Sequence, residues 1–347
     1  MSHQPAILVT GGTGYIGSHT IVDLVQNGFR VVSIDNHLRS KPETIQRIES
    51  ITGQPLKNYA IDLCNKEELR KVFRLEKTIT GIIHFAALKS VPESVEKPVQ
   101  YYRNNINSLL NLLELTSEFS IKHFVFSSSC SVYGNTTQLP VTEETPFGEA
   151  ESPYARSKQM SEEIIRDFSK TSDTQFVLLR YFNPVGAHES GLLGEDTTDV
   201  ITAMVPRITG TAIGKYSSFK VFGTDYDTRD GSCIRDYIHV MDIAGAHTKA
   251  LQYLETNPAE TFASHTPEVF NLGTGNGVTV LEAIASFEKV SGQKLSYTLA
   301  ERRAGDVVSI YANNNKAVSK LNWQIKRDLD TMMRTAWVWE QYLAGKA

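Results

Sequence analysis

The chain has 347 residues, of which 41% are hydrophobic and 21% charged, and its formal net charge is −4 at pH 7. This length fits two domains, or one large α/β domain with an added lobe, and the composition is typical of a globular protein with a sizeable core. The small negative charge gives no reason to expect nucleic acid or an anionic membrane as a partner, and no apolar run approaches the roughly 18 residues that span a bilayer.

The cysteines and the first residues indicate the compartment. Cys64, Cys130 and Cys233 are odd in number and far apart, so their spacing matches neither a disulfide framework nor a metal site, and we expect no bound metal. The chain begins with MSHQP, which has no basic segment leading into a long apolar one, and this argues against a signal peptide. Together these features favour the cytoplasm.

The first 35 residues have the order strand, glycine loop, helix, strand, acid. Residues 6–10 (AILVT) predict a buried strand that leads into the glycine-rich stretch 11–17 (GGTGYIG). Residues 18–27 have helical periodicity, and a second strand, 29–34, ends at Asp35. Glycines allow backbone N–H groups to approach a pyrophosphate, and an acid at this place accepts hydrogen bonds from an adenosine ribose. We therefore expect a dinucleotide site with NAD favoured over NADP, although Arg39 and Lys41 nearby weaken that preference.

Strands and helices continue to alternate along the first half of the chain. We expect strands at 58–63, 81–87, 123–129 and 175–183, and helices at about 67–73, 99–119 and 157–168. This order predicts an α/β fold, a Rossmann-type doubly wound parallel sheet. Ligands of such sheets bind at the carboxyl ends of the strands. The residues at those ends are Asp35, Asp62, Phe85, Ala86, Ala87, Lys89, Ser127, Ser128, Ser129, Tyr181, Phe182 and Asn183.

The pattern changes after about residue 183. Loops rich in Gly, Asp and Thr, at 191–198 and 223–232, interrupt the alternation. We therefore expect residues 1–183 to form the NAD-binding domain, with a later segment at about 235–250 returning to it. Residues 184–347 are expected to form mainly a smaller C-terminal α/β lobe that binds the substrate.

Tyr154 and Lys158 are four residues apart, so on a helix both side chains project from the same face. Pro153 suits the first position of such a helix. A phenol titrates near ~10 in water, and a neighbouring cation lowers its pKa, so this pair predicts an acid/base. Taken alone the pattern is weak evidence, because a tyrosine and a lysine four residues apart also occur on ordinary solvent-exposed helix faces.

Six longer stretches make the pair more informative. They are GGTGYIGSHT at 11–20, HFAALK at 84–89, FSSS at 126–129, SPYARSK at 152–158, LRYFNPVGAH at 179–188 and RDYIHVMD at 235–242. Over nearly its whole length the chain resembles the extended short-chain dehydrogenase/reductases, and within them the nucleotide-sugar 4-epimerases. The resemblance implies an NAD-dependent isomerase that inverts carbon 4 of a UDP-hexose through a transient 4-keto sugar.

The resemblance also implies roles for individual residues. Tyr154 is expected to act as the base, Lys158 to stabilise its phenolate and Ser129 to orient the reacting oxygen. The residues expected to contact NAD are Gly11, Gly14, Tyr15, Ile16, Gly17, Asp35, Asn36, Asp62, Leu63, Phe85, Ala86, Lys89, Asn104, Ser127, Tyr154, Lys158 and Tyr181. Those expected to contact the UDP-sugar are Lys89, Ser129, Tyr154, Phe182, Asn183, Phe222, Arg235, Arg303, Asp306 and Ile310. Arg302 is interpreted as a surface ion pair. A homodimer through two helices per subunit, within 99–119 and 157–170, is implied as well.

Five residues, at three places in the chain, bear on the reaction and the sugar. Nucleotide-sugar dehydratases of this family carry carboxylates directly after the serine or threonine, whereas this chain has Cys130 and Ser131, which favours epimerisation. An Asn-Asn pair common in the epimerases falls here on Thr202 and Ala203, which leaves a side-chain contact to the diphosphate open. Ile310 is intermediate between the tyrosine that goes with glucose and galactose and the small residue that goes with N-acetyl sugars.

We expect UDP-glucose and UDP-galactose as the main substrate pair, with some N-acetylhexosamine turnover. The alternative is a UDP-N-acetylglucosamine 4-epimerase or another nucleotide-sugar epimerase. A more remote alternative is a non-catalytic NAD-binding regulator on the same fold, although such proteins usually lack the tyrosine or the lysine.

Overall fold

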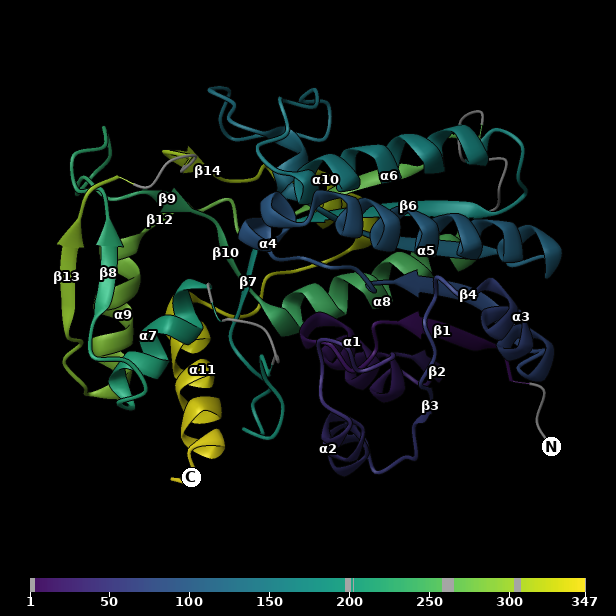
Figure 1. Ribbon diagram of the computed structural model, residues 1–347, viewed down its shortest axis with the longest axis horizontal. Coiled ribbons are helices and arrows are strands. Elements are labelled where there is room, and N and C mark those ends of the chain that lie inside the picture. Colours follow the sequence, from purple (N-terminus) through teal and green to yellow (C-terminus); the bar gives the residue numbers. More distant parts are fainter. Residues whose placement is uncertain (1–3, 197–200, 202, 258–264, 303–306, 347) are drawn as a thin grey trace.

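The computed structural model describes residues 4–196, 201, 203–257, 265–302 and 307–346. A seven-stranded sheet forms the larger part of the molecule, with strand order β11-β6-β5-β4-β1-β2-β3 (Figure 1). All its neighbouring strands run parallel. The strands are β1 (Ala6–Thr10), β2 (Arg30–Ile34), β3 (Lys57–Tyr59), β4 (Ile79–His84), β5 (His123–Ser129), β6 (Gln175–Tyr181) and β11 (Glu268–Leu272). The predicted doubly wound parallel sheet is confirmed.

Helices cover both faces of this sheet. Successive residues of a strand point to opposite faces, so Ile7 and Val9 enter one core while Ala6 and Leu8 enter the other. The first core is covered by α1 (Tyr15–Gln26), α2 (Glu43–Thr52), α8 (Val240–Thr256) and α10 (Asn315–Leu321). The second is covered by α3 (Lys66–Leu75), α5 (Pro98–Glu118) and α6 (Pro153–Ser169). Burial on both faces explains why β1 is a continuous apolar run.

The order of the strands places a crevice between β1 and β4. The chain proceeds from β1 toward β2 and β3 on one side, and from β4 toward β5 and β6 on the other. The loops after β1 and β4 therefore leave the sheet in opposite directions, and ligands of doubly wound sheets bind at such a point. The short helix α4 (Val91–Glu96) follows β4, and the 3₁₀ helix η1 (Cys130–Tyr133) follows β5.

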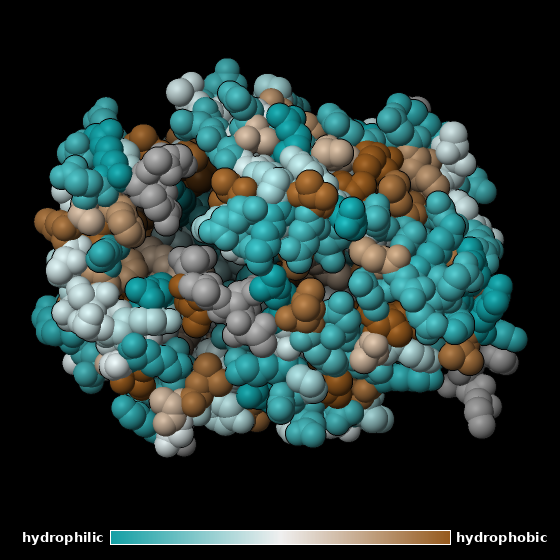
Figure 2. All heavy atoms as spheres, in the orientation of Figure 1, coloured by the Kyte–Doolittle hydropathy of each residue, from teal (hydrophilic) through white to brown (hydrophobic). Residues whose placement is uncertain are grey.

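A smaller lobe contains three short sheets, β10-β7, β12-β9-β14 and β13-β8. Its strands are β7 (Asn183–Val185), β8 (Phe219–Phe222), β9 (Ile234–Arg235), β10 (Tyr237–His239), β12 (Val278–Thr279), β13 (Tyr297–Ala300) and β14 (Ser309–Ile310). Its helices, α7 (Met204–Ala212), α9 (Val280–Ser291) and α11 (Leu329–Leu343), share a separate apolar core. Figure 2 shows a hollow between this lobe and the large sheet.

One predicted strand divides in the structure, and one strand of the large sheet was not predicted. Residues 175–183, predicted as one strand, divide into β6 and β7, because β6 pairs with β5 and β11 whereas β7 pairs with β10 of the smaller lobe. The sheet also gains β11 from residues 268–272, far along the chain. Helix α8 packs on α1.

Within the described residues we find no helix with the length and apolarity that a membrane crossing needs, and no cluster of His, Cys, Asp or Glu suited to a metal ion.

Candidate active site

The glycine loop joins β1 to α1 at the crevice. Gly11 has φ +69°, and a Cβ there would lie 2.8 Å from the backbone nitrogen of Ala86 in the loop after β4. A Cβ on Gly17 would lie 3.0 Å from the carbonyl carbon of Gly11 and closer still to its oxygen. Gly14 is the N-cap of α1 and has no side chain to occupy the helix N-terminus. The loop therefore presents backbone N–H groups at a positive helix end, which suits a pyrophosphate.

Asp35 lies immediately after β2 and is held beside this loop. Its carboxylate accepts hydrogen bonds from the backbone N–H of Thr13 (3.1 Å) and of His37 (2.9 Å), and from the Ser40 hydroxyl (3.0 Å). These bonds hold the acid where a ribose would need it.

The two cations near Asp35 pair with other acids. Arg39 forms a salt bridge with Glu93 at 2.8 Å, and Lys41 forms one with Asp196 at 2.6 Å. A 2′-phosphate would therefore meet Asp35 and two cations that are already engaged, which is consistent with the predicted preference for NAD.

The remaining predicted cofactor residues follow β3 and β4 or lie on α5. Asp62 and Leu63 lie in the loop between β3 and α3, and Phe85 and Ala86 directly follow β4. The backbone N–H of Phe85 donates to Thr10 O at 3.1 Å, which draws the ends of β4 and β1 together. Asn104 lies on α5, where its amide donates to Asn105.

Lys89 connects the loop after β4 to another part of the chain. Its ammonium lies 2.9 Å from Glu195, in the segment that follows β7. In the same segment, the carbonyl oxygen of Gly186 accepts a hydrogen bond of 2.6 Å from the Tyr15 hydroxyl. Asp196, at its end, pairs with Lys41 and, at 2.9 Å, with Arg47. Residues 186–196 therefore form a strap that is tied to the glycine loop and its neighbours.

Ser129, Tyr154 and Lys158 come together at the end of β5. The Ser152 side chain caps α6 by accepting from Ala155 N, and Pro153 takes the first helical position. The helix therefore begins just before Tyr154, and the predicted one-turn spacing is observed. The Ser129 hydroxyl hydrogen-bonds to the Tyr154 phenol. The Lys158 ammonium donates to Ser127 O at 2.6 Å.

The pKa of Tyr154 departs from the sequence prediction that a neighbouring cation lowers it. Burial raises this pKa to about 12, while the hydrogen bond with Ser129 acts in the opposite direction. Lys158 makes no comparable contribution because its ammonium lies 6.0 Å from the centre of the Tyr154 ring and is bonded to Ser127 O. Burial lowers the pKa of Lys158 itself to about 8, and Glu162 opposes that change. Desolvation thus favours a neutral phenol beside a readily titrated ammonium.

On the substrate side, Asp236 links three strands of the smaller lobe to the large sheet. The carboxylate of this fully buried residue accepts from Thr274 N (2.7 Å), the Thr274 hydroxyl (2.6 Å), Gly275 N (3.1 Å) and Ala312 N (3.1 Å). Its carbonyl accepts from the backbone N–H (2.9 Å) and the side-chain amide (3.2 Å) of Asn183. Asn183 is therefore held at the start of β7, next to the end of β6.

The other predicted substrate residues lie on neighbouring elements. Arg235 on β9 pairs in register with Ile310 on β14. Ile310 is 6% exposed and Phe182 is 3% exposed, and both belong to one buried apolar cluster. Phe222, at the end of β8, is 37% exposed. The structure thus brings Phe182 and Ile310 together but leaves Phe222 on the rim.

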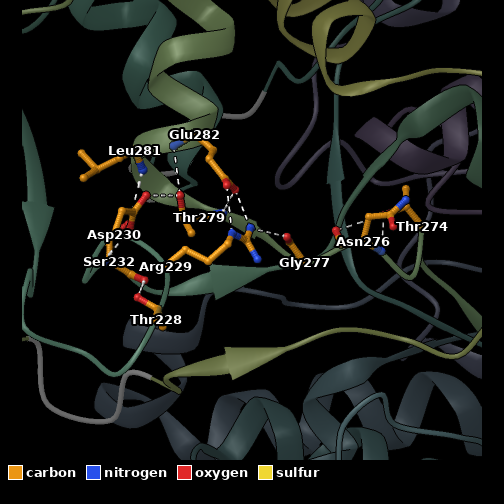
Figure 3. Close-up of polar contacts among 10 residues, drawn as sticks. All are labelled: Thr228, Arg229, Asp230, Ser232, Thr274, Asn276, Gly277, Thr279, Leu281 and Glu282. Carbon is orange, nitrogen blue, oxygen red and sulfur yellow. Dashed lines mark hydrogen bonds and ion pairs between the residues drawn. The ribbon is translucent and has the colours of Figure 1, made fainter.

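A polar network fixes the sheet that carries Arg235 (Figure 3). Thr279 and Glu282 form a capping box at the start of α9, and Asp230 bonds to the Thr279 hydroxyl. Arg229 reaches across to Glu282 (2.6 and 3.0 Å) and to Gly277 O (2.8 Å). These bonds tie the loop before β9 to β12, its partner strand, so that Arg235 sits on a braced backbone.

Three positions predicted to matter lie outside the described residues: Arg303, Asp306 and Thr202. Ala203, beside Thr202, is the N-cap of α7. Arg302 forms a salt bridge of 2.8 Å with Asp225, both largely exposed, as expected of a surface ion pair.

Two buried polar residues near the site escaped the sequence reasoning. Asn105 on α5 binds the backbone of Leu88 in both directions, at 2.9 and 3.0 Å, and holds the loop that carries Lys89. Glu162 on α6 accepts from the Ser128 hydroxyl at 2.5 Å. Asn105 interrupts a largely apolar buried face of α5, and that interruption is the signal that could have identified it. The buried face of α6 is mostly polar, so Glu162 had no such signal.

Comparisons with known proteins agree with this geometry. The family model described as GDP-mannose 4,6 dehydratase matches residues 8–336. A UDP-glucose 4-epimerase of Haemophilus influenzae is 44% identical over 337 residues, which cover 97% of this chain and 97% of that relative. The chain belongs to the UDP-glucose 4-epimerase family. This confirms the resemblance found in the sequence.

Solved members of the epimerase family have the same fold. The crystal structure of UDP-glucose 4-epimerase from Bifidobacterium longum in complex with NAD+ and UDP matches with a TM-score of 0.91 and 42% identity, covering 98% of this chain and 99% of that one. The UDP-Glc/GlcNAc 4-epimerase from Campylobacter jejuni matches with a TM-score of 0.83 and 36% identity, covering 97% and 99%. The family model carries a dehydratase's name, but Cys130 and Ser131 on η1 hold no carboxylate.

Proposed function

We propose that the chain is an NAD-dependent UDP-glucose 4-epimerase, an isomerase that interconverts UDP-glucose and UDP-galactose by inverting carbon 4. The observation that carries this proposal is the meeting of Tyr154, Ser129 and Lys158 at the end of β5, on the edge of the sheet that also holds the glycine loop. A single acid/base beside a hydride acceptor removes one proton and returns it, and the inversion needs no second acid.

The residues around the glycine loop fit NAD. A Cβ would fill the space at Gly11 and Gly17, and the start of α1 offers N–H groups to a pyrophosphate. The Asp35 carboxylate would accept hydrogen bonds from the hydroxyls of the adenosine ribose. When bound, NAD supplies the hydride acceptor, and the positive charge of its oxidised ring favours a phenolate nearby. We assign cofactor contact to all the residues that the sequence analysis expects to contact NAD, from Gly11 to Tyr181.

Tyr154 moves the proton. As a phenolate it takes the proton of the sugar 4-hydroxyl while hydride leaves carbon 4, and it later returns that proton to the same oxygen. Ser129 hydrogen-bonds the reacting oxygen, and its bond to Tyr154 keeps the two hydroxyls adjacent. The Lys158 ammonium alone does not offset the effect of burial on Tyr154, but together with the positive ring of bound NAD its charge favours the phenolate. The 4-keto sugar turns over within the site between the two transfers.

The smaller lobe holds the UDP-sugar. Asn183 and Arg235, both on backbone braced around Asp236, face the diphosphate, and Arg303 and Asp306 are assigned to the same ligand. Phe182 and Phe222 line the pocket, and Lys89 reaches both ligands. We propose the same division of the chain for binding: residues 1–183 for NAD, joined by the later segment at 235–250, and 184–347 mainly for the UDP-sugar.

Ile310 supports UDP-glucose and UDP-galactose as the main pair. Its side chain is packed with Phe182 in the buried cluster, so it restricts the pocket more than a small residue would and less than a tyrosine. Initial rates with UDP-galactose and with UDP-N-acetylgalactosamine measure this preference. Exclusive turnover of the N-acetyl pair would reverse our order and favour the UDP-N-acetylglucosamine 4-epimerase alternative.

Tyr154→Phe tests the mechanism. It removes one oxygen from the buried site, and we expect epimerisation to fall by at least about a thousandfold while NAD remains bound. Tyr297→Phe is the matched control, because Tyr297 is 42% exposed on β13, and it should retain full activity. Turnover that survives Tyr154→Phe contradicts the mechanism. A wild-type chain that binds NAD but turns over neither sugar pair would be a regulator.

We assign the chain to the cytoplasm because its three cysteines are free thiols. We also propose a homodimer formed through α5 and α6, which pack against each other and run side by side (Figure 1). Val99 and Leu110 on α5 are 65% and 40% exposed, which gives this face apolar surface to bury. Light scattering of the purified chain checks the dimer, and Leu110→Arg should shift it toward monomer.

A further inference from the structure

A buried ion pair lies beside the catalytic residues. Glu162, on α6 one turn after Lys158, is 0% exposed, and Arg180 on β6 is 1% exposed. The guanidinium binds the carboxylate with two bonds, of 2.9 and 2.7 Å. Taking both charges out of water is unfavourable, and an apolar pair of similar volume would often be as stable. The pair therefore calls for an explanation beyond stability.

Glu162 holds the strand that carries the catalytic serine. The Ser128 hydroxyl donates to Glu162 at 2.5 Å. Ser128 lies between Ser127, whose carbonyl accepts from the Lys158 ammonium at 2.6 Å, and Ser129, whose hydroxyl bonds to Tyr154. Anchoring Ser128 fixes the backbone on both sides of it, and with that backbone the Ser127 carbonyl and the position of Ser129.

Arg180 extends the same anchor to other elements. It pairs in register with Ser128 across β5 and β6. It donates to the Tyr133 hydroxyl on η1 at 2.9 Å, and that hydroxyl donates to Asn271 on β11 at 2.6 Å. The residue after Arg180, Tyr181, bonds to the Ser127 hydroxyl. The ion pair thus connects α6, β5, β6, η1 and β11 around the catalytic residues.

The charges around Lys158 give Glu162 a second effect. On α6 the ammonium faces Tyr154 and Glu162, and on β4 it faces His84, whose pKa is lowered to about 3 by burial and by Lys158. On β5 it meets the Phe126 ring and Ser127 O. On β6, Tyr181 has a pKa raised well above its usual range by burial and stays neutral. Glu162 opposes the fall in the pKa of Lys158 that burial causes, and Arg180 and Arg166 in turn pair with Glu162.

We propose that Glu162 is a positioning residue for epimerisation: its carboxylate anchors Ser128 so that Ser127 O and the Ser129 hydroxyl face Lys158 and Tyr154, and its charge keeps Lys158 an ammonium. Arg180 orients that carboxylate. This inference rests on the proposed function, because it assigns Glu162 a role in that reaction.

The test is the pH profile of kcat for UDP-galactose in wild type and in Glu162→Gln. Without the negative charge the pKa of Lys158 falls further, so Lys158 loses its proton at lower pH. We expect the alkaline fall in kcat to move down by on the order of one pH unit, which lowers kcat at pH 7.5 by about threefold more than at pH 6. KM should change less than twofold because Glu162 touches no substrate. Glu162→Asp should restore part of the alkaline range.

Glu163→Gln is the matched control, since Glu163 is the next residue of α6 and is exposed. It should leave the profile unchanged. If Glu162→Gln does not fold, Ser128→Ala tests the anchor with the ion pair intact, and we expect kcat to fall severalfold with KM and the alkaline range unmoved.

The outcomes separate the two proposals. If wild type turns over no UDP-hexose, the proposed function fails and the profile has no meaning. If wild type is active, an unmoved alkaline range in folded Glu162→Gln overturns the charge role, and an unchanged kcat in Ser128→Ala overturns the anchor.

Discussion

Two glycines in neighbouring helices should respond to alanine with opposite signs. Gly17 lies in α1 and Gly245 in α8, and these helices pack on each other. Alanine in place of a helical glycine normally stabilises a protein by about 0.5–1 kcal/mol, because glycine loses more backbone freedom on folding. A Cβ on Gly245 would meet one atom within 4 Å, an Asp23 carboxylate oxygen at 4.0 Å. We therefore expect Gly245→Ala to gain this stabilisation.

Gly17→Ala should lose stability instead. Its Cβ would lie 3.0 Å from the Gly11 carbonyl carbon, 3.1 Å from the Gly12 Cα and closer still to the Gly11 oxygen. These are backbone atoms, which no rotamer change can move aside. Overpacking costs about 1–3 kcal/mol, so after the helix gain we expect a net loss of about 1–2 kcal/mol. Gly11 must also shift away from β4, and we expect NAD affinity to fall at least about tenfold, since a lost bond to a phosphate is worth about 1.5–3 kcal/mol.

Urea unfolding followed by circular dichroism measures the stabilities, and extraction of each purified variant measures its NAD content. The comparison is sharp because the substitution, the type of element and the helix pair are the same. A Gly17→Ala variant that is as stable as Gly245→Ala and retains a full complement of NAD would refute the steric reasoning.

Three further predictions concern buried acids. Burial raises the pKa of Glu76, but bonds to Lys57, Arg30 and Tyr59 outweigh it and lower the pKa to about 2. The ionised carboxylate therefore stabilises the fold above its ordinary pKa of 4.5, and this stabilisation is lost as the pH falls through about 2. The difference in unfolding free energy between wild type and Glu76→Gln, measured by urea unfolding, should shrink over that interval. Asp236→Asn replaces one carboxylate oxygen by a donor facing N–H groups, and we expect a loss of about 2–3 kcal/mol in unfolding free energy and a higher KM for UDP-galactose. Asp196→Asn weakens both salt bridges that Asp196 makes at the end of the strap, and stopped-flow release of NAD should become severalfold faster. An unchanged rate would show that the strap does not retain the cofactor.

The sequence by itself determined the dinucleotide half of this protein. The order of strand, glycines, helix and Asp35 is local, and each part follows from periodicity or from the conformational freedom of glycine. The spacing of Tyr154 and Lys158 is one helical turn, so their common face was predictable before any tertiary contact was known. The long motifs at 179–188 and 235–242 identified the family in the same way.

Only the tertiary structure decided what surrounds these residues. Glu162 and Arg180 are 18 residues apart in the chain, and β11 reaches the sheet from residues 268–272, so no local pattern places them beside Ser128. The pKa of Tyr154 differs from the sequence prediction for the same reason. Spacing indicates that a cation is near, but burial depends on every element packed around the phenol, and here burial outweighs the cation.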